Sequence, residues 1–184
     1  MEEKKKLWGF ETKQVVYAAI GAALYAVLAI ATNMLQLPGA GNVSIRPAVA
    51  IPMFFGVAFG PIVGFITGFV GNILADLLSG YGFWLWWDLG NGLLGLIPGL
   101  IYPTIESYRA SKSIWKAEIF VVLGALVGMG LASLSEMWVS GADLNTVIFA
   151  NFLPAFLSDI INGLILVPLL MIAYAAIVER SGRD

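Results

Sequence analysis

Five long stretches of this chain contain no charged residue, and this feature limits its possible folds more than any other. The stretches cover residues 14–45, 47–75, 89–105, 119–135 and 160–178. A helix needs about 20 apolar residues to cross the hydrocarbon core of a bilayer. Of the 184 residues only 12% are charged and 59% are hydrophobic, and the mean hydropathy is +0.87, whereas about 25% of the residues in soluble domains are charged. The sequence therefore predicts an integral membrane protein.

We expect residues 1–184 to form a single all-α domain, an integral membrane bundle of six transmembrane helices. Pro47 and Pro61 are expected at helix starts, because proline is tolerated in a first helical turn. The predicted helices cover roughly residues 14–34, 47–59, 62–79, 85–105, 117–138 and 154–178.

The basic residues predict the orientation of this bundle. With six spans, nine of the ten Lys and Arg residues lie on one side, and Arg46 is the exception. Basic residues near helix ends stay on the cytoplasmic side. We therefore expect both termini in the cytoplasm and a multi-pass protein of the cell membrane.

Composition excludes several functions. The chain contains no Cys and no His, which removes thiol nucleophiles, disulfides and the usual zinc and haem ligands. It also lacks a Walker motif and a Gly-x-Ser-x-Gly elbow, and its scattered basic residues predict no nucleic-acid partner. We expect no catalytic residue, metal or cofactor, although Asp76 and Asp88 leave a small intramembrane carboxylate enzyme as an alternative.

Acidic residues gather in the predicted outer half of the bundle, where ionisable groups are costly and indicate function. Three of them have an amide three or four residues away, so each of these pairs shares a helix face. The acids are Asp76, Asp88, Glu136, Asp143 and Asp159, and the amides are Asn72, Asn91 and Asn162.

Tryptophans occupy the same level. Trp84, Trp86 and Trp87 immediately precede Asp88, and Trp138 ends the fifth predicted helix. An interfacial aromatic belt is one interpretation. Indole rings beside carboxylates and amides also suit a flat heteroaromatic ligand, and we expect a ligand-binding cavity open to the outside.

Small residues recur at four-residue spacing in two predicted helices, which lets helices approach closely. Gly60, Gly64 and Gly68 favour packing within the bundle. For Ala18, Ala22 and Ala26 two interpretations are open, packing inside the bundle or docking of a separate membrane protein.

Several motifs resemble a known family. The segments Asn42-Val43-Ser44-Ile45-Arg46-Pro47-Ala48, Phe59-Gly60-Pro61 with the spaced glycines up to Asn72, Asp76, and Gly82-Phe83-Trp84-Leu85-Trp86-Trp87 resemble the substrate-binding S component of energy-coupling factor (ECF) vitamin transporters. Within that family the chain is most similar to the branch usually assigned to riboflavin. The resemblance is good over about residues 14–100 and general, in helix number and length, beyond them. Related sequences often have His where this chain has Asn72, and the lack of His argues against the nickel and cobalt members.

The resemblance implies a non-enzymatic binding subunit of an ABC-type importer. It would capture a vitamin, riboflavin first, from outside and deliver it through a membrane coupling subunit and two ATPase subunits. Trp84, Trp87 or Trp138 would stack on the ligand; Asp88, Asn91, Asp159 and Asn162 would bind its polar edges; Asn42 and Arg46 would lie on a gating loop. Asp76 would contact ligand or hold the fourth helix in place. Ala18, Ala22 and Ala26 would form the coupling surface.

Two alternatives to this function are open. The acids of the outer half suit a cation better than a neutral flavin, so thiamine or a thiamine precursor is the rival substrate. A structural or assembly protein of the membrane, which binds no small molecule, is the rival outside transport.

Overall fold

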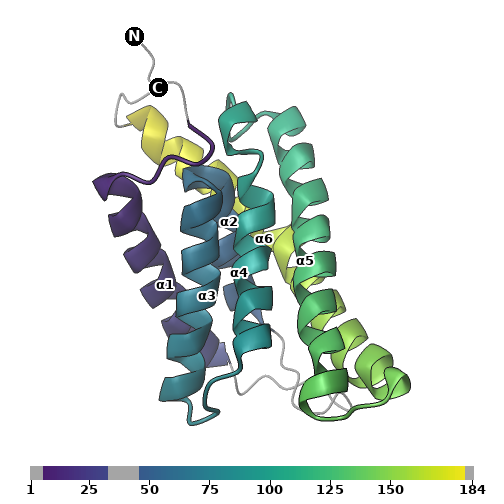
Figure 1. Cartoon of the computed structure of the whole chain (residues 1–184). Coiled ribbons are helices and arrows are strands. Elements are labelled where there is room, and N and C mark those ends of the chain that lie inside the picture. The colour runs from purple at the N-terminus through teal and green to yellow at the C-terminus, as the bar shows by residue number, and fades with distance from the viewer. Residues whose placement is uncertain (1–5, 33–45, 181–184) are drawn as a thin grey trace.

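A computed structural model describes residues 6–32 and 46–180. Six α-helices lie side by side in a bundle, and this part of the chain contains no strand (Figure 1). The prediction of an all-α fold is thus confirmed. The α-helices are α1 (Thr12–Thr32), α2 (Ala50–Phe59), α3 (Pro61–Leu78), α4 (Leu85–Gly99), α5 (Ser111–Val139) and α6 (Leu153–Arg180). Short helical turns precede or link them, namely η1 (Pro47–Val49), η2 (Tyr102–Thr104) and the π-helical η3 (Thr146–Phe152).

Within residues 6–32 and 46–180, four helical segments are long and apolar enough to cross a membrane. Three are α1, α3 and α5, and the fourth is Thr146–Arg180, which joins η3 to α6. The other two helices, α2 and α4, have 10 and 15 residues. Both are shorter than the roughly 20 residues that a straight span requires.

Two helix boundaries differ clearly from those predicted. The fourth helix ends at Gly99 instead of near 105, because Pro103 disfavours α-helical geometry at the residue before it and the chain tightens into η2. The fifth begins at Ser111 instead of 117, and its first turns carry Lys112 and Lys116. Long basic side chains can extend from a helix to the membrane interface. The helix can therefore begin before the charge-free stretch, and the prediction made it too short at its start.

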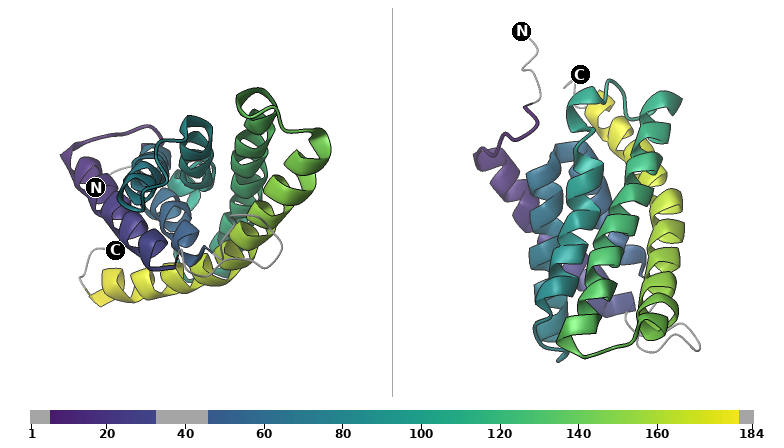
Figure 2. Two further views of the ribbon diagram at one scale, coloured as in Figure 1. Left: turned by 90° about the horizontal axis from the view of Figure 1, so that it is seen from below. Right: turned by 45° about the vertical axis from the view of Figure 1, so that its right-hand side comes forward.

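Helix α2 lies in the middle of the bundle. It contacts α1, α3, α4 and α6, and most of its residues are buried (Figure 2). The chain then reverses at Gly60, whose φ of 108° lies in a region that favours glycine, and Pro61 starts α3. This tight reversal places α2 and α3 side by side.

Glycines let α3 and α4 approach each other closely, as the four-residue spacing predicted. A Cβ atom added at Gly64 or Gly95 would collide with the backbone of the other, and one at Gly68 would collide with the Asn91 carbonyl. Close backbone approach of this kind is typical of small residues in membrane helices. It brings the polar residues of α3 against those of α4.

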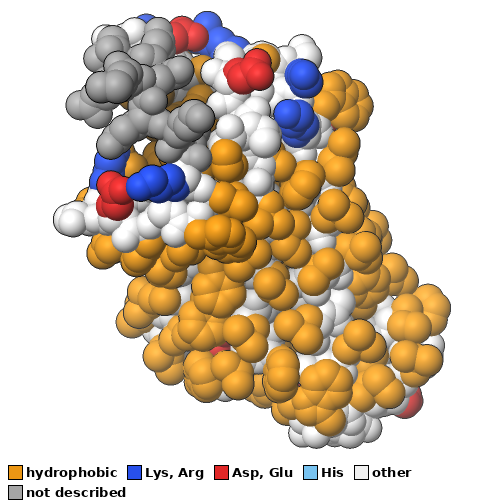
Figure 3. Space-filling model, turned by 45° about the horizontal axis from the view of Figure 1, so that its top comes forward, with side chains coloured by type: hydrophobic (Ala, Val, Ile, Leu, Met, Phe, Trp, Pro, Cys, Tyr) orange, Lys and Arg blue, Asp and Glu red, His pale blue; other side chains and the backbone are white. Residues whose placement is uncertain are grey.

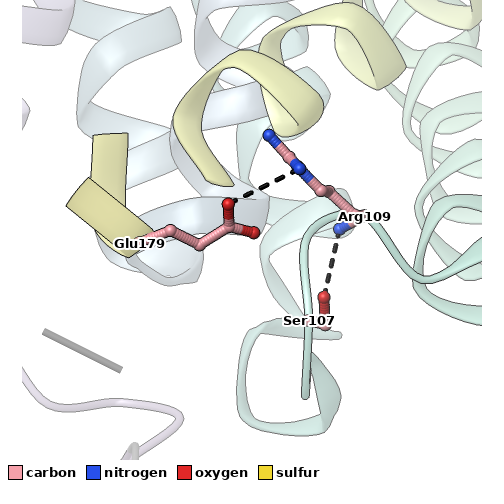
Figure 4. A network of polar contacts seen from close by, with 3 residues as sticks. All are labelled: Ser107, Arg109 and Glu179. Carbon is pink, nitrogen blue, oxygen red and sulfur yellow. Dashed lines mark hydrogen bonds and ion pairs between the residues drawn. The ribbon is translucent and has the colours of Figure 1, made fainter. Parts of the chain in front are cut away.

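Hydrophobic side chains cover the face of the bundle seen in Figure 3, and Lys, Arg and Glu side chains gather at the end where α1 begins and α6 ends. We call this the basic end, defined by Lys13, Arg109, Lys112 and Lys116. Here Arg109 Nη1 forms an ion pair with Glu179 Oε2 at 3.5 Å, and its backbone N–H donates to Ser107 Oγ at 3.3 Å (Figure 4). The ion pair joins the segment before α5 to the end of α6. We call the opposite end the acidic end, defined by Asp76, Asp88, Glu136, Asp143 and Asp159.

Candidate functional site

A buried polar cluster lies toward the acidic end, and Arg46 is its centre. This residue immediately precedes η1, and its Nη2 donates to Tyr25 Oη at 2.6 Å, to Asn91 Oδ1 and, more weakly, to Asn72 Oδ1 at 3.4 Å. One guanidinium group therefore connects α1, α3 and α4.

The amides extend this cluster to the carboxylates. Asn72 Nδ2 donates to Asp76 Oδ2 and to Asp88 Oδ1, both at 2.8 Å, and so bridges α3 and α4. The Tyr25 hydroxyl lies within hydrogen-bond distance of both Asn91 Oδ1 and Asn72 Oδ1, at 2.9 and 3.1 Å. Buried polar groups of this kind must be hydrogen-bonded to be tolerated in a low-dielectric interior. The polar cluster is hereafter Tyr25, Arg46, Asn72, Asp76, Asp88 and Asn91.

Asp159 lies on α6 beside the polar cluster. The backbone N–H of Arg46 donates to Ser158 Oγ at 3.3 Å, which ties the start of η1 to α6. Asp159 is fully buried and interacts electrostatically with Arg46 and Tyr25. Within the described part of the chain, neither of its carboxylate oxygens has a hydrogen-bond partner.

An aromatic pocket opens between the start of α4 and the end of α5. Its volume is about 320 Å³. Trp87 Nε1 donates to Glu136 Oε1 at 2.8 Å across it, and Ser140 Oγ donates to Glu136 Oε2. Asn91 Nδ2 donates to the Trp87 carbonyl, so the pocket and the polar cluster share the first turns of α4. The lining residues are Phe83, Trp84, Leu85, Trp86, Trp87, Ser135, Glu136 and Val139.

The structure brings together many of the predicted ligand-binding residues. Arg46, Asp76, Asp88 and Asn91 belong to the polar cluster, and Trp84 and Trp87 line the aromatic pocket. Their role in binding stays a prediction.

Other predicted residues lie elsewhere. Trp138 packs edge-to-face on Trp86, with ring centroids 5.5 Å apart, and is absent from the pocket lining. Asn162 Nδ2 donates to the Ser158 carbonyl of its own helix. Asn42 lies outside the described residues.

Tyr25, Asn72 and Glu136 were not among the predicted ligand-binding residues. Asn72 and Glu136 had a signal in the sequence, since one is four residues from Asp76 and the other belongs to the outer acids. Tyr25 had none, because it lies among alanines and leucines of a charge-free stretch.

The predicted coupling surface on the first helix needs correction. Ala18, Ala22 and Ala26 are buried, at 2–3% exposure, and they pack inside the bundle. The reason is that α3 packs closely against this face of α1, because Gly71 of α3 has no side chain. A Cβ atom at Gly71 would collide with the Tyr25 ring and crowd the Ala22 carbonyl. The alanines that α1 leaves exposed are Ala19, Ala23 and Ala31.

Long apolar helices that enclose a hydrophobic core and a buried polar cluster define this chain as an integral membrane protein of the helical-bundle class. Its sequence identifies it further: the model of the family described as "ECF-type riboflavin transporter, S component" matches residues 9–176, and the chain belongs to this family. It is a family of transporter components and not of enzymes.

Several relatives share most of the chain. A UPF0397 protein of Vibrio atlanticus is 39% identical over 148 residues, which are 77% of this chain and 75% of the relative. A UPF0397 protein of Streptococcus pneumoniae is 32% identical over 178 residues, 94% of this chain and 95% of the relative. No solved structure matches the chain.

Proposed function

We propose that this chain is the substrate-binding subunit of an ECF-type importer, which captures a heteroaromatic vitamin from outside the cell. The observation that carries the proposal is the aromatic pocket of about 320 Å³ that adjoins the buried polar cluster at the acidic end. Indole rings supply a flat apolar surface, and nearby polar groups orient a ligand. Ligand sites in membrane proteins also concentrate the rare buried ionisable residues.

The proposed topology has six membrane crossings with both termini in the cytoplasm, and the acidic end faces outward. The basic residues of the opposite end support this orientation through the positive-inside rule. Helices α2 and α4 are short for a crossing, and we propose that each crosses together with the adjoining turn, η1 before α2 and η2 after α4. The membrane is the cytoplasmic membrane.

Two substrates are candidates. Riboflavin follows from the description of the matching family. Thiamine or a thiamine precursor follows from the acidic residues around the site. Within the site, Trp84 and Trp87 would contact the ring, Asp88 and Asn91 its polar edge, and Asp76 would hold α4 through Asn72.

The test is a titration of the purified full chain in detergent, after any bound small molecule has been released and identified. Quenching of tryptophan fluorescence and calorimetry would follow binding of riboflavin and thiamine. Saturable binding of either supports the proposal. If neither binds and no small molecule is released, the chain is better explained as a membrane assembly protein.

Delivery would require a membrane coupling subunit and two ATPase subunits, because the chain has no Walker motif. We propose that the exposed face of α1 at Ala19 and Ala23 contacts the coupling subunit. Ala23→Trp is expected to leave ligand binding intact and abolish uptake in cells. Ala22→Trp, its buried neighbour, is expected to disrupt folding and binding together. Normal uptake by Ala23→Trp would exclude this face.

A further inference from the structure

The acidic end is short of positive charge. Arg46 is the only basic residue between Lys13 and Arg109, and none lies between Lys116 and Arg180. Asp76 of α3 and Asp159 of α6 interact electrostatically with this single arginine, and Asp88 of α4 shares the Asn72 amide with Asp76.

None of the side-chain hydrogen bonds of the polar cluster reaches Asp159. Both bonds from Asn72 Nδ2 go to Asp76 and Asp88, and the Asn91 amide donates to the Trp87 carbonyl. Arg46 Nη2 donates to the hydroxyl and amide oxygens of Tyr25, Asn91 and Asn72, not to a carboxylate. The ion pairs of the described residues within 4 Å do not include Arg46.

Asp159 is the carboxylate that this arrangement leaves without a hydrogen bond. Its exposure is 0%, and both of its oxygens lack a hydrogen bond among the residues described. Asp88 Oδ2 is in the same condition, although Asp88 Oδ1 accepts from Asn72. A buried carboxylate is tolerated when a charge or donor is paired with it. Asp159 also interacts electrostatically with Arg46 and Tyr25 of the polar cluster, and its neighbour Ser158 accepts from the Arg46 backbone N–H.

We infer that the substrate supplies this partner: Asp159 binds a positively charged or protonated nitrogen of a compact heteroaromatic ligand, with Asp88 Oδ2 as a second acceptor. The inference rests on the proposed function and narrows its substrate class to cations. The surplus of acids at this end also attracts a cation from solution, and tryptophan rings bind cations through their faces. A neutral flavin would add no positive charge to a site that has three aspartates and one arginine.

The test is calorimetric titration of the purified full chain in detergent with thiamine, a cation, and with riboflavin, which is neutral. We expect thiamine to bind saturably and more tightly than riboflavin. Asp159→Asn is expected to weaken thiamine binding at least about tenfold, because one member of a buried charge pair is lost. The control is Asp143→Asn, which changes an exposed acid of the same end. It should change the affinity for thiamine less than about twofold.

The outcomes separate this inference from the proposed function. Tight riboflavin binding without thiamine binding, or release of a neutral compound from the purified chain, overturns the inference and leaves the proposed function standing. Thiamine binding that Asp159→Asn does not weaken also overturns it. If the chain neither binds thiamine or riboflavin nor releases a compound, both the inference and the proposed function are overturned. Should Asp159→Asn fail to fold, the preference of the unaltered chain for thiamine over riboflavin decides, with Asp159→Glu as the charge-retaining variant.

Discussion

Tyr25 shows how much one hydroxyl group can hold together. Its Oη accepts from Arg46 and lies within hydrogen-bond distance of Asn72 and Asn91, in a completely buried position. Removing one partner from a buried network costs about 1–3 kcal/mol, because the remaining groups stay desolvated. Tyr25→Phe should therefore lower the free energy of unfolding by about 1–3 kcal/mol, measured by thermal unfolding in detergent.

The control for this variant is Tyr81→Phe. Tyr81 is 51% exposed at the acidic end, and its carbonyl accepts from Trp84 Nε1. Its substitution leaves that backbone contact in place. If the two variants unfold alike, the Tyr25 hydroxyl contributes nothing to the stability of the cluster.

The polar cluster was predictable in part from the sequence, and the reason is local. Asp88, Asn91 and Arg46 stand out in the sequence because a charge or an amide inside a long apolar stretch is costly in a membrane and indicates a functional role. The contact between Arg46 and Tyr25 could not be predicted, since it depends on how η1 is placed against α1. A tyrosine in an apolar stretch looks the same whether it faces lipid or a buried arginine.

At the scale of helices, the glycines of α3 and α4 are expected to limit stability. A Cβ atom at Gly95 would meet the Gly64 carbonyl and backbone, which cannot move aside as a flexible side chain can. Gly95→Ala should thus push α3 and α4 apart and lower the free energy of unfolding by about 1–3 kcal/mol or more. Thermal unfolding in detergent is the measurement.

Gly130→Ala is the matched control on α5, where an added Cβ atom meets nothing within 4 Å. Alanine is favoured over glycine inside a helix by about 0.5–1 kcal/mol. This variant should be as stable as the unaltered chain or more so. Equal losses in both variants would mean that glycine contributes something other than close packing.

The helix pattern was predicted well because the bilayer enforces long apolar segments, but the neighbours of each face were not. Alanines at positions 18, 22 and 26 define a stripe, and a stripe of small residues has the same spacing whether it meets Gly71 of the same chain or another subunit. Which of these occurs depends on the packing of α1 against α3. The sequence pattern of α1 does not contain that information.

The turn before α6 should respond to pH through Asp143. Hydrogen bonds from Thr146, first from its backbone N–H at 2.7 Å, lower the pKa of this exposed carboxyl below its ordinary value of 3.8. Because this pKa is lowered, the ionised Asp143 carboxylate stabilises the turn fully above pH about 4. The stabilisation is lost as the pH falls through the lowered pKa.

Hydrogen exchange would measure this contribution at the Thr146 amide. Its protection factor should be constant from neutral pH down to about 4 and fall below it. Asp143→Ala should lower protection at neutral pH, and its difference from the unaltered chain should shrink in acid. A difference that persists unchanged at the lowest pH would show that ionisation of Asp143 is irrelevant to this turn.

The whole molecule has two chemically different ends, and their assignment to the two sides of the membrane can be measured directly. The chain has no Cys, so single cysteines can be introduced without a background. Gly80 and Ala142 lie in the turns after α3 and α5 at the acidic end, whereas Lys6 and Lys112 lie at the basic end.

With six crossings and cytoplasmic termini, Gly80→Cys and Ala142→Cys should react with a membrane-impermeant maleimide in intact cells. Lys6→Cys and Lys112→Cys should react only after permeabilisation, because basic ends are retained in the cytoplasm. The reverse pattern would mean that the acidic end faces inward, which would remove the electrostatic reason for capturing a ligand from outside. Labelling that differs between Gly80→Cys and Ala142→Cys would show that α4 or α5 does not cross, since these two helices separate the two turns. The same four variants therefore test both the number of crossings between these turns and the direction in which the candidate site opens.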